Sequence, residues 1–283
     1  MPHAAEPSVG EPAGAAHGSA ATSETPSDAP SDPPSAPRAP VASGRLPDAV
    51  LWDMDGTLVD TEPSWMGAER GLVEEFGGRW TAQDAERMIG LPLPAAAQIL
   101  QDHGVDLPIE AIGVRLVDGV IAAVGRRLDW QPGALELLAA LREAAVPCAL
   151  VTMSYRRFAQ AVLYQGPPEA FDAVVTGDEI THPKPHPEPY LRAAELLGVD
   201  IRRCVAIEDS PPGLASALAS GARTLGVQHI VPVERRPGLS RVSSLVDIGL
   251  GELRRIASGE VLDLLDATAG ADATVSAAGG PRG

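Results

Sequence analysis

The sequence predicts an α/β protein: a parallel sheet with helices on both faces, interrupted by an inserted all-helical domain. Short apolar runs alternate with amphipathic helical patterns between residues 134 and 227, which is typical of a parallel sheet. The patterning between residues 64 and 127 is helical and shows no obvious strand, which predicts the insertion. The expected strands are 48–53, 147–151, 173–175, 204–207 and, as the last strand, 222–227.

The helices expected within the insertion follow from apolar spacing and from glycine or proline stops. They cover residues 64–76, 82–89, 94–103 and 109–127. The helices expected around the sheet cover 134–144, 156–164, 187–197 and 214–219. The predicted organisation is therefore a Rossmann-like core made of 46–62 and 131–250, with a helical domain over 63–130 inserted between its two parts.

Both ends of the chain have a composition that does not favour a packed core. Residues 1–45 are mostly Ala, Pro, Ser and Gly without aromatic side chains, and residues 267–283 are similar. Such segments bury too little apolar surface to offset their conformational entropy, so both are predicted to be disordered tails. A targeting or docking role for the first tail is the alternative.

The overall charge excludes several classes of partner. The chain has 22 basic and 38 acidic residues, a net charge of −16, which gives no electrostatic footprint for nucleic acid or an anionic membrane. An anionic substrate would therefore need a local cation. Cys148 and Cys204 lie in apolar runs and are expected to be buried thiols. No membrane span or secretory signal is visible, so we expect a cytoplasmic location. We also expect a monomer.

The run from Ala49 to Trp52 is followed by Asp53, Asp55 and Gly56. Four consecutive apolar residues indicate a strand buried on both faces, and such a strand delivers the two carboxylates to the carboxyl edge of the sheet. There they can flank one ligand. The alternative is a solvated Asp-Gly turn after a core strand.

Three later segments also place polar groups where apolar strands end. Residues 152–154 (Thr-Met-Ser) offer a hydroxyl and backbone N–H groups at a helix entrance, which suits a phosphate, although Ser154 could equally be a simple N-cap. Lys184 lies in a loop stiffened by prolines, where a lysine is usually solvated. Glu208 and Asp209 are adjacent carboxylates that repel each other unless a cation neutralises them.

Taken together, these groups predict phosphoryl chemistry. The four carboxylates are oxygen ligands of the kind that Mg²⁺ prefers, and Lys184 would offset repulsion between a carboxylate nucleophile and a phosphate. One aspartate of the first motif can attack phosphorus, and the other can transfer the proton. The carboxylates concerned are Asp53, Asp55, Glu208 and Asp209.

At this point the sequence resembles the haloacid dehalogenase superfamily of phosphohydrolases. The resemblance spans about residues 48–233 and rests on four motifs in order: 53–60 (DMDGTLVD), 151–154 (VTMS), Lys184 within PKPHPEPY, and 207–210 (IEDS). The helical block between the first two motifs resembles the cap of the subgroup that includes β-phosphoglucomutase and phosphoglycolate phosphatase.

The resemblance implies a role for each matching residue. It makes Asp53 the nucleophile and Asp55 the acid/base, which also lends its main-chain carbonyl to Mg²⁺. It also implies that the cap closes over the substrate and excludes water. The remaining roles are metal binding by Asp53, Asp55, Glu208 and Asp209, and binding of the substrate phosphate by Thr152, Met153 and Lys184.

Departures from the family pattern narrow the expected activity. Asp55 is present, whereas the dehalogenases of the family lack this second aspartate. Trp65 stands where β-phosphoglucomutases carry a histidine, and residues 88–94 offer no Arg or Lys for a second phosphate. We therefore expect a Mg²⁺-dependent phosphatase acting on a small phosphorylated metabolite, such as a sugar phosphate. The alternatives are a β-phosphoglucomutase-like phosphomutase and a catalytically idle phosphate-binding module.

Overall fold

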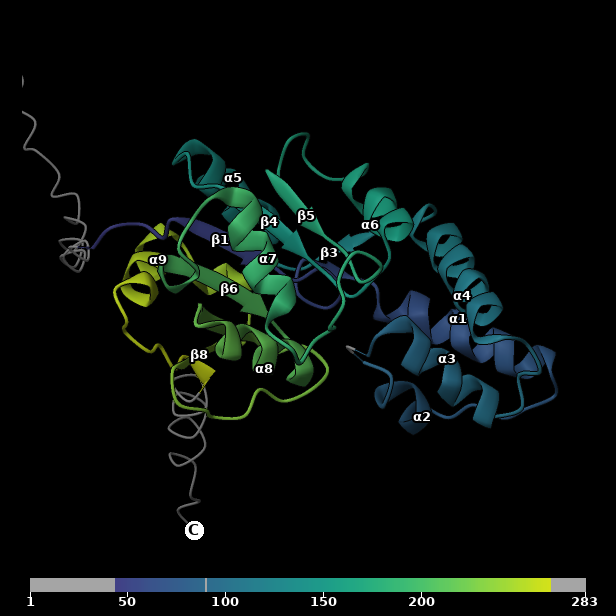
Figure 1. Ribbon diagram of the computed structural model, residues 1–283. Coiled ribbons are helices and arrows are strands. Elements are labelled where there is room, and N and C mark those ends of the chain that lie inside the picture. The colour runs from purple at the N-terminus through teal and green to yellow at the C-terminus, as the bar shows by residue number, and fades with distance from the viewer. Residues whose placement is uncertain (1–43, 90, 266–283) are drawn as a thin grey trace, which may run out of the picture. The chain divides into compact units, whose positions relative to one another are not determined.

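The computed structural model describes residues 44–89 and 91–265. The two predicted tails, 1–45 and 267–283, lie outside these residues apart from Gly44 and Arg45. Within the described part, the chain alternates between strands and helices after an early helical block, as the sequence pattern predicts (Figure 1).

The core is a six-stranded sheet in the order β5-β4-β1-β6-β7-β8, and every neighbouring pair is parallel. Strand β1 is central because its apolar run is flanked on both sides, with Trp52 opposite Leu150 of β4 and Ile207 of β6. This confirms the predicted fold class. The strands are β1 (Ala49–Trp52), β4 (Cys148–Val151), β5 (Ala173–Val175), β6 (Cys204–Glu208), β7 (Arg223–Val227) and β8 (Leu239–Val242).

Helices cover both faces of this sheet (Figure 1), because alternate strand residues point to opposite sides. Ala49 and Leu51 pack with Tyr190 of α7, whereas Val50 and Trp52 belong to the larger core with α5, α6 and α9. The helices are α5 (Ala134–Glu143), α6 (Arg156–Leu163), α7 (Glu188–Leu197), α8 (Pro211–Ser220) and α9 (Leu250–Ala257), with short 3₁₀ turns η1 (Ile201–Arg203) and η2 (Leu245–Asp247).

The helical insertion consists of four helices, among which α4 packs against α1 and α3. Its entrance and exit are joined by a small antiparallel pair of strands, in which Val59 lies opposite Trp130. The two connections to the core are therefore held side by side. The elements are β2 (Val59–Asp60), α1 (Glu62–Glu75), α2 (Ala82–Glu86), α3 (Leu93–Asp102), α4 (Ile109–Val124) and β3 (Asp129–Trp130).

The prediction that 222–227 is the last strand is wrong. Strand β8 and helix α9 follow it, and Leu253 and Ile256 of α9 are buried in the core. The expected core boundary at residue 250 falls at the start of α9. Strand β8 has the sequence LSRV, and the charged Arg241 interrupts the apolar run by which a buried strand is predicted. Asp263 holds the Arg241 guanidinium with both oxygens, at 2.7 and 2.9 Å, which makes this burial possible.

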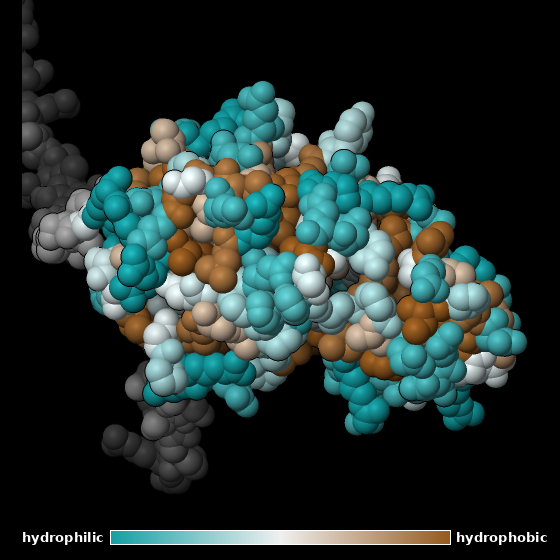
Figure 2. Space-filling view, in the orientation of Figure 1, coloured by the Kyte–Doolittle hydropathy of each residue, from teal (hydrophilic) through white to brown (hydrophobic). Residues whose placement is uncertain are grey.

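Polar residues are distributed over the visible surface, with apolar areas between them (Figure 2). The most exposed large apolar side chains come from separate elements: Val114 of α4, Tyr164 after α6, and Val246 of η2. None of the helices within residues 44–89 and 91–265 is both long and apolar enough to cross a membrane.

Candidate active site

Three adjacent strands bring the predicted site residues to one edge of the sheet. Asp53 directly follows β1, Thr152 directly follows β4, and Glu208 is the last residue of β6. Because these strands are parallel neighbours, their carboxyl ends meet there. The interpretation of Asp53 to Gly56 as an isolated, solvated turn is therefore wrong, since Asp53 is only 6% exposed.

Asp53, Glu208 and Asp209 form a buried acidic cluster in which one oxygen of each lies within 4.8 Å of the others. Burial, followed by the charge of Glu208, raises the pKa of Asp53 and of Asp209 well above the usual carboxyl range. A buried cluster of three carboxylates needs a compensating cation. Hard oxygen donors in this number fit a divalent cation such as Mg²⁺.

The Lys184 side chain is buried against this cluster. Its Nζ donates to Asp53 Oδ1 at 2.6 Å, to Glu208 Oε1 at 2.5 Å and to the carbonyl of Val151 at 3.0 Å, so all three ammonium hydrogens have partners. Burial disfavours its charge, but Asp53 and Glu208 outweigh this effect and raise the pKa of Lys184 above its ordinary value. The solvated alternative for Lys184 is wrong.

A second set of contacts fixes the orientation of Glu208. The Tyr190 hydroxyl donates to Glu208 Oε1 at 2.8 Å, and the Ser210 hydroxyl donates to Glu208 Oε2 at 3.1 Å. The backbone N–H groups of Asp209 and Ser210 also point to Oε2. A carboxylate that is 0% exposed is thereby satisfied on both oxygens and cannot turn away from Lys184.

Gly56 allows Asp209 to reach the cluster. Its φ is +84°, and a Cβ placed there would lie 2.3 Å from Asp209 Oδ2. The adjacent Thr57 hydroxyl donates to Asp209 Oδ1 at 2.8 Å, so the same turn both makes room for this carboxylate and holds it. No larger residue fits at position 56 without moving Asp209.

Substitution of Gly56 by Ala is therefore expected to weaken cation binding as well as stability. Gly77→Ala is a matched control, because Gly77 has φ +76° but no atom within 4 Å of its Cβ position. In both variants the free energy of unfolding should fall by about 1 kcal/mol, because alanine is strained in the left-handed conformation. Only Gly56→Ala should also raise the Mg²⁺ concentration that gives half-maximal thermal stabilisation. Equal Mg²⁺ dependence in the two variants would show that Asp209 is not displaced.

The side chain of Asp55 lies outside the three-carboxylate group and accepts four hydrogen bonds. Its Oδ1 receives Thr61 Oγ1 at 2.5 Å and Trp65 Nε1 at 3.1 Å. Its Oδ2 receives Ser154 Oγ at 2.8 Å and Thr152 Oγ1 at 3.2 Å. Asp55 therefore connects the insertion, through Trp65 of α1, with the turn that follows β4.

The 152–154 turn contacts both Asp55 and the loop that carries Lys184. Ser154 is not an N-cap: its hydroxyl donates to Asp55, and α6 begins after Tyr155 without a side-chain cap. Met153 lines the cavity above the site, and its Sδ accepts the backbone N–H of Lys184 at 3.3 Å. Its observed contact is thus with the lysine loop.

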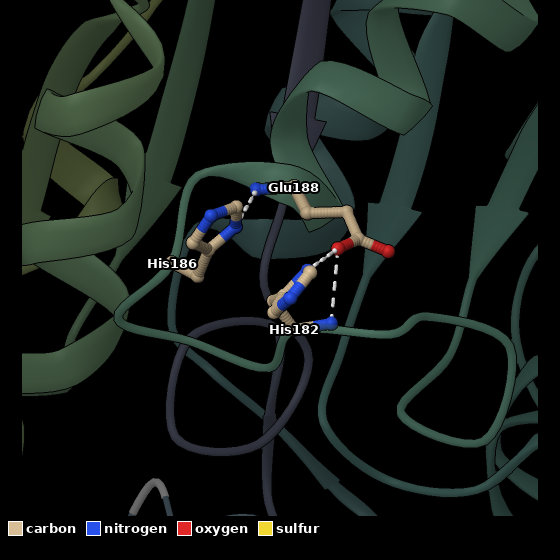
Figure 3. Close-up of side chains that lie close together, drawn as sticks. All are labelled: His182, His186 and Glu188. Carbon is tan, nitrogen blue, oxygen red and sulfur yellow. Dashed lines mark hydrogen bonds and ion pairs between the residues drawn. The ribbon is translucent and has the colours of Figure 1, made fainter.

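Figure 3 shows His182, His186 and Glu188 close together: the two histidines lie on the loop that carries Lys184, and Glu188 is the first residue of α7. The Glu188 carboxylate accepts the backbone N–H of Thr181 at 2.7 Å and that of His182 at 2.9 Å, and it contacts the His182 ring at 2.6 Å. Both histidines are exposed and do not line the cavity. Glu188 therefore anchors the start of the loop to the first turn of α7.

Substitution Glu188→Ala is expected to lower phosphate release, because the loop that positions Lys184 loses its anchor. A misplacement of this kind reduces turnover by about ten- to a hundredfold. Glu195→Ala on the same helix is the control, since that side chain is 70% exposed and forms an ion pair with Arg192. Parallel kcat measurements on the two variants test this. Equal activities would mean that the prolines alone hold the loop.

Several residues at this site were not predicted from the sequence. Lys184 was predicted, but its burial was not, although it is the only lysine among the 22 Lys and Arg residues of the chain. A compact ammonium suits three converging acceptors, whereas a planar guanidinium does not, so a single lysine among arginines was an available signal. The unpredicted contacts come from Thr57, Thr61, Ser154, Tyr190 and Ser210.

The sheet is parallel and carries a helical insertion, and two aspartates, a buried lysine and a carboxylate cluster lie at its edge. This combination is typical of a capped phosphohydrolase. Comparison with known families agrees: the model of the family described as haloacid dehalogenase-like hydrolase matches residues 47–221. The chain belongs to this family. The resemblance seen in the sequence is confirmed, and so is the predicted class, a phosphoric monoester hydrolase.

Three similar proteins show the range of the family. The bifunctional riboflavin kinase/FMN phosphatase of Arabidopsis thaliana is 29% identical over 73% of this chain, which spans only 55% of that longer protein. The phosphorylated carbohydrates phosphatase of Thermotoga maritima is 32% identical over 64% of this chain and 86% of its own length. The crystal structure of CbbY from Rhodobacter sphaeroides with phosphate is 25% identical, covers 72% of this chain and 97% of that chain, and gives a TM-score of 0.67.

Proposed function

We propose that this protein is a Mg²⁺-dependent phosphatase that hydrolyses a small phosphorylated metabolite, in particular a sugar phosphate, through an aspartyl-phosphate intermediate. One observation carries the proposal: Asp53 lines a cavity, accepts a hydrogen bond from the buried Lys184 and belongs to one cluster with two further carboxylates. The similarity to a phosphatase of phosphorylated carbohydrates supports the choice of substrate class.

Asp53 and the residues around it have separate roles in phosphoryl transfer. Asp53 attacks phosphorus, forming a bond from its carboxylate oxygen while the bond to the ester oxygen breaks. Lys184 reduces the repulsion between this carboxylate and the phosphate, and its charge lowers the pKa of Asp53 against the larger opposing effect of burial. Asp53, Glu208 and Asp209 would hold Mg²⁺, which supplies further positive charge to the phosphoryl oxygens when bound.

Asp55 is placed to handle the proton. It gives a proton to the departing ester oxygen in the first step and takes one from water in the second, when the aspartyl-phosphate is hydrolysed. Thr152 and Ser154 orient its Oδ2, and Thr61 and Trp65 orient its Oδ1. Because an indole N–H only donates, Trp65 can fix this carboxylate but cannot exchange a proton with it.

A panel of phosphate esters tests the proposal directly. The purified chain should release inorganic phosphate from at least one sugar monophosphate in the presence of Mg²⁺, and EDTA should abolish the release. No release from any ester would contradict a phosphatase. Interconversion of sugar 1- and 6-phosphates, with no release of phosphate, would instead support the phosphomutase.

A further inference from the structure

The cavity above Asp53 has a mixed lining on the side of the insertion. Helix α1 places Glu62, Trp65 and Glu69 on one face of the helix, at positions i, i+3 and i+7, and all three line the cavity. The rest of that wall is apolar and comes from α1 itself and from other parts of the insertion. Its apolar members include Met66, Met88, Leu91, Leu93, Ala96 and Leu116.

The same lining is poor in positive charge. Among the described residues that line the cavity, Lys184 is the only cationic one, and its three hydrogens are already directed to Asp53, Glu208 and Val151. Arg156 and Arg157, which follow the phosphate motif in sequence, pair with Glu179 and Asp118 and do not line the cavity. A second anionic group on the substrate would therefore meet carboxyl groups without a cation.

Glu69 is the most unusual of these groups. It is 4% exposed, and its Oε2 is buried without a hydrogen-bond partner in the described part of the chain. The Nε1 of Trp80 is likewise buried without a partner of hydrogen-bonding geometry among the described residues, although it is near enough to lower the pKa of Glu69. Buried polar atoms are nearly always paired, and a carboxyl oxygen without such a partner in a cavity wall is available to a ligand.

The ionisation of Glu69 suits an uncharged ligand. Burial raises its pKa to about 7, although the Trp80 indole acts in the opposite direction. Near neutral pH it therefore exists in part as a neutral carboxyl group, which donates as well as accepts hydrogen bonds. Alcohol hydroxyl groups match both capacities.

We propose that Glu69, assisted by Glu62, is the specificity-determining residue for the leaving group, and that it selects monophosphate esters of neutral polyols. Hydroxyl groups of the polyol pair with the two carboxyl groups, and its carbon skeleton packs against the apolar wall. This inference rests on the proposed phosphatase function. It goes beyond that function in naming the recognising residue and in excluding substrates with a second phosphate.

The experiment compares kcat/KM for sorbitol 6-phosphate and phenyl phosphate, because phenyl phosphate uses the same phosphoryl site but carries no hydroxyl groups. Glu69→Leu should lower kcat/KM for sorbitol 6-phosphate about ten- to a hundredfold, mainly through KM, and leave phenyl phosphate within about threefold. Glu69→Gln keeps a hydrogen-bonding side chain and should retain most of the preference. Glu74→Gln, at an exposed position of the same helix, is the control.

Each result decides the matter. Equal losses on both substrates in Glu69→Leu, at unchanged thermal stability, would show that Glu69 is structural. In the native protein, turnover of fructose 1,6-bisphosphate or glucosamine 6-phosphate faster than that of sorbitol 6-phosphate would overturn the assignment to neutral polyol monophosphates. Absence of phosphate release from every ester would overturn the proposed function and, with it, this inference. Release of phosphate without a preference for polyol phosphates would overturn this inference alone.

Discussion

Substitution Asp53→Asn is expected to reduce phosphate release by about 10⁴-fold or more, because the amide cannot form the acyl-phosphate bond on which the cycle depends. The loss should be in kcat, since Asn retains the size of Asp and an oxygen that can accept from Lys184 Nζ. A malachite-green or coupled phosphate assay on the best substrate of the panel measures it. Asp106→Asn, at an exposed position, is the control.

The same substitution should not destabilise the fold in EDTA. The pKa of Asp53 is raised in the folded state by burial and by Glu208, so stability falls as the pH rises above the ordinary carboxyl range and this group is forced to ionise. An asparagine does not ionise, so the variant does not lose stability in this way as the pH rises. The unfolding free energy of Asp53→Asn relative to the native chain should therefore increase between pH 5 and pH 8, and Mg²⁺ should reduce the difference.

Two results would contradict this account. Phosphate release by Asp53→Asn at a rate near that of the native chain would remove Asp53 as the nucleophile. A variant that is inactive but strongly destabilised at pH 8 in EDTA would mean that Asp53 serves mainly to neutralise Lys184, so that the inactivity reports a damaged fold.

Substitution Lys184→Met is expected to damage both activity and stability. Lys184 is the cation between Asp53 and Glu208, and removing it leaves Glu208, which is 0% exposed, without a charge partner. Breaking a buried ion pair in this way costs about 3–5 kcal/mol. Phosphate release should fall at least about a hundredfold, because the repulsion between nucleophile and substrate is no longer offset.

Substitution Lys184→Arg tests whether the positive charge of Lys184 is sufficient or whether the shape of its side chain is also needed. Its guanidinium retains the positive charge, but the longer planar group cannot place one nitrogen against Asp53, Glu208 and the Val151 carbonyl together. We expect it to remain folded better than Lys184→Met and to stay largely inactive. Urea unfolding in EDTA and kcat measurements distinguish the two, with Arg126→Met at an exposed position as the control. Native-like turnover by Lys184→Arg would show that charge alone is sufficient.

The sheet and the insertion could be predicted because their signals are local. Apolar runs such as Ala49–Trp52 and Cys204–Ile207 are short, bounded and followed by charge, and alternation with helices determines that they pair in parallel. Strand β8 has no such signal. Arg241 becomes acceptable in a buried strand only because Asp263 reaches it from 22 residues away.

The sequence by itself determined that carboxylates, a hydroxyl turn and a lysine follow successive strands, since parallel strands must bring their carboxyl ends to one edge. Only the tertiary structure decided how they are used. Whether Lys184 is solvated or buried, or Ser154 a cap or a partner of Asp55, depends on distances between segments about a hundred residues apart. The same holds for Glu69, an ordinary helical residue in the sequence, because burial and the absence of a partner are properties of the packed molecule.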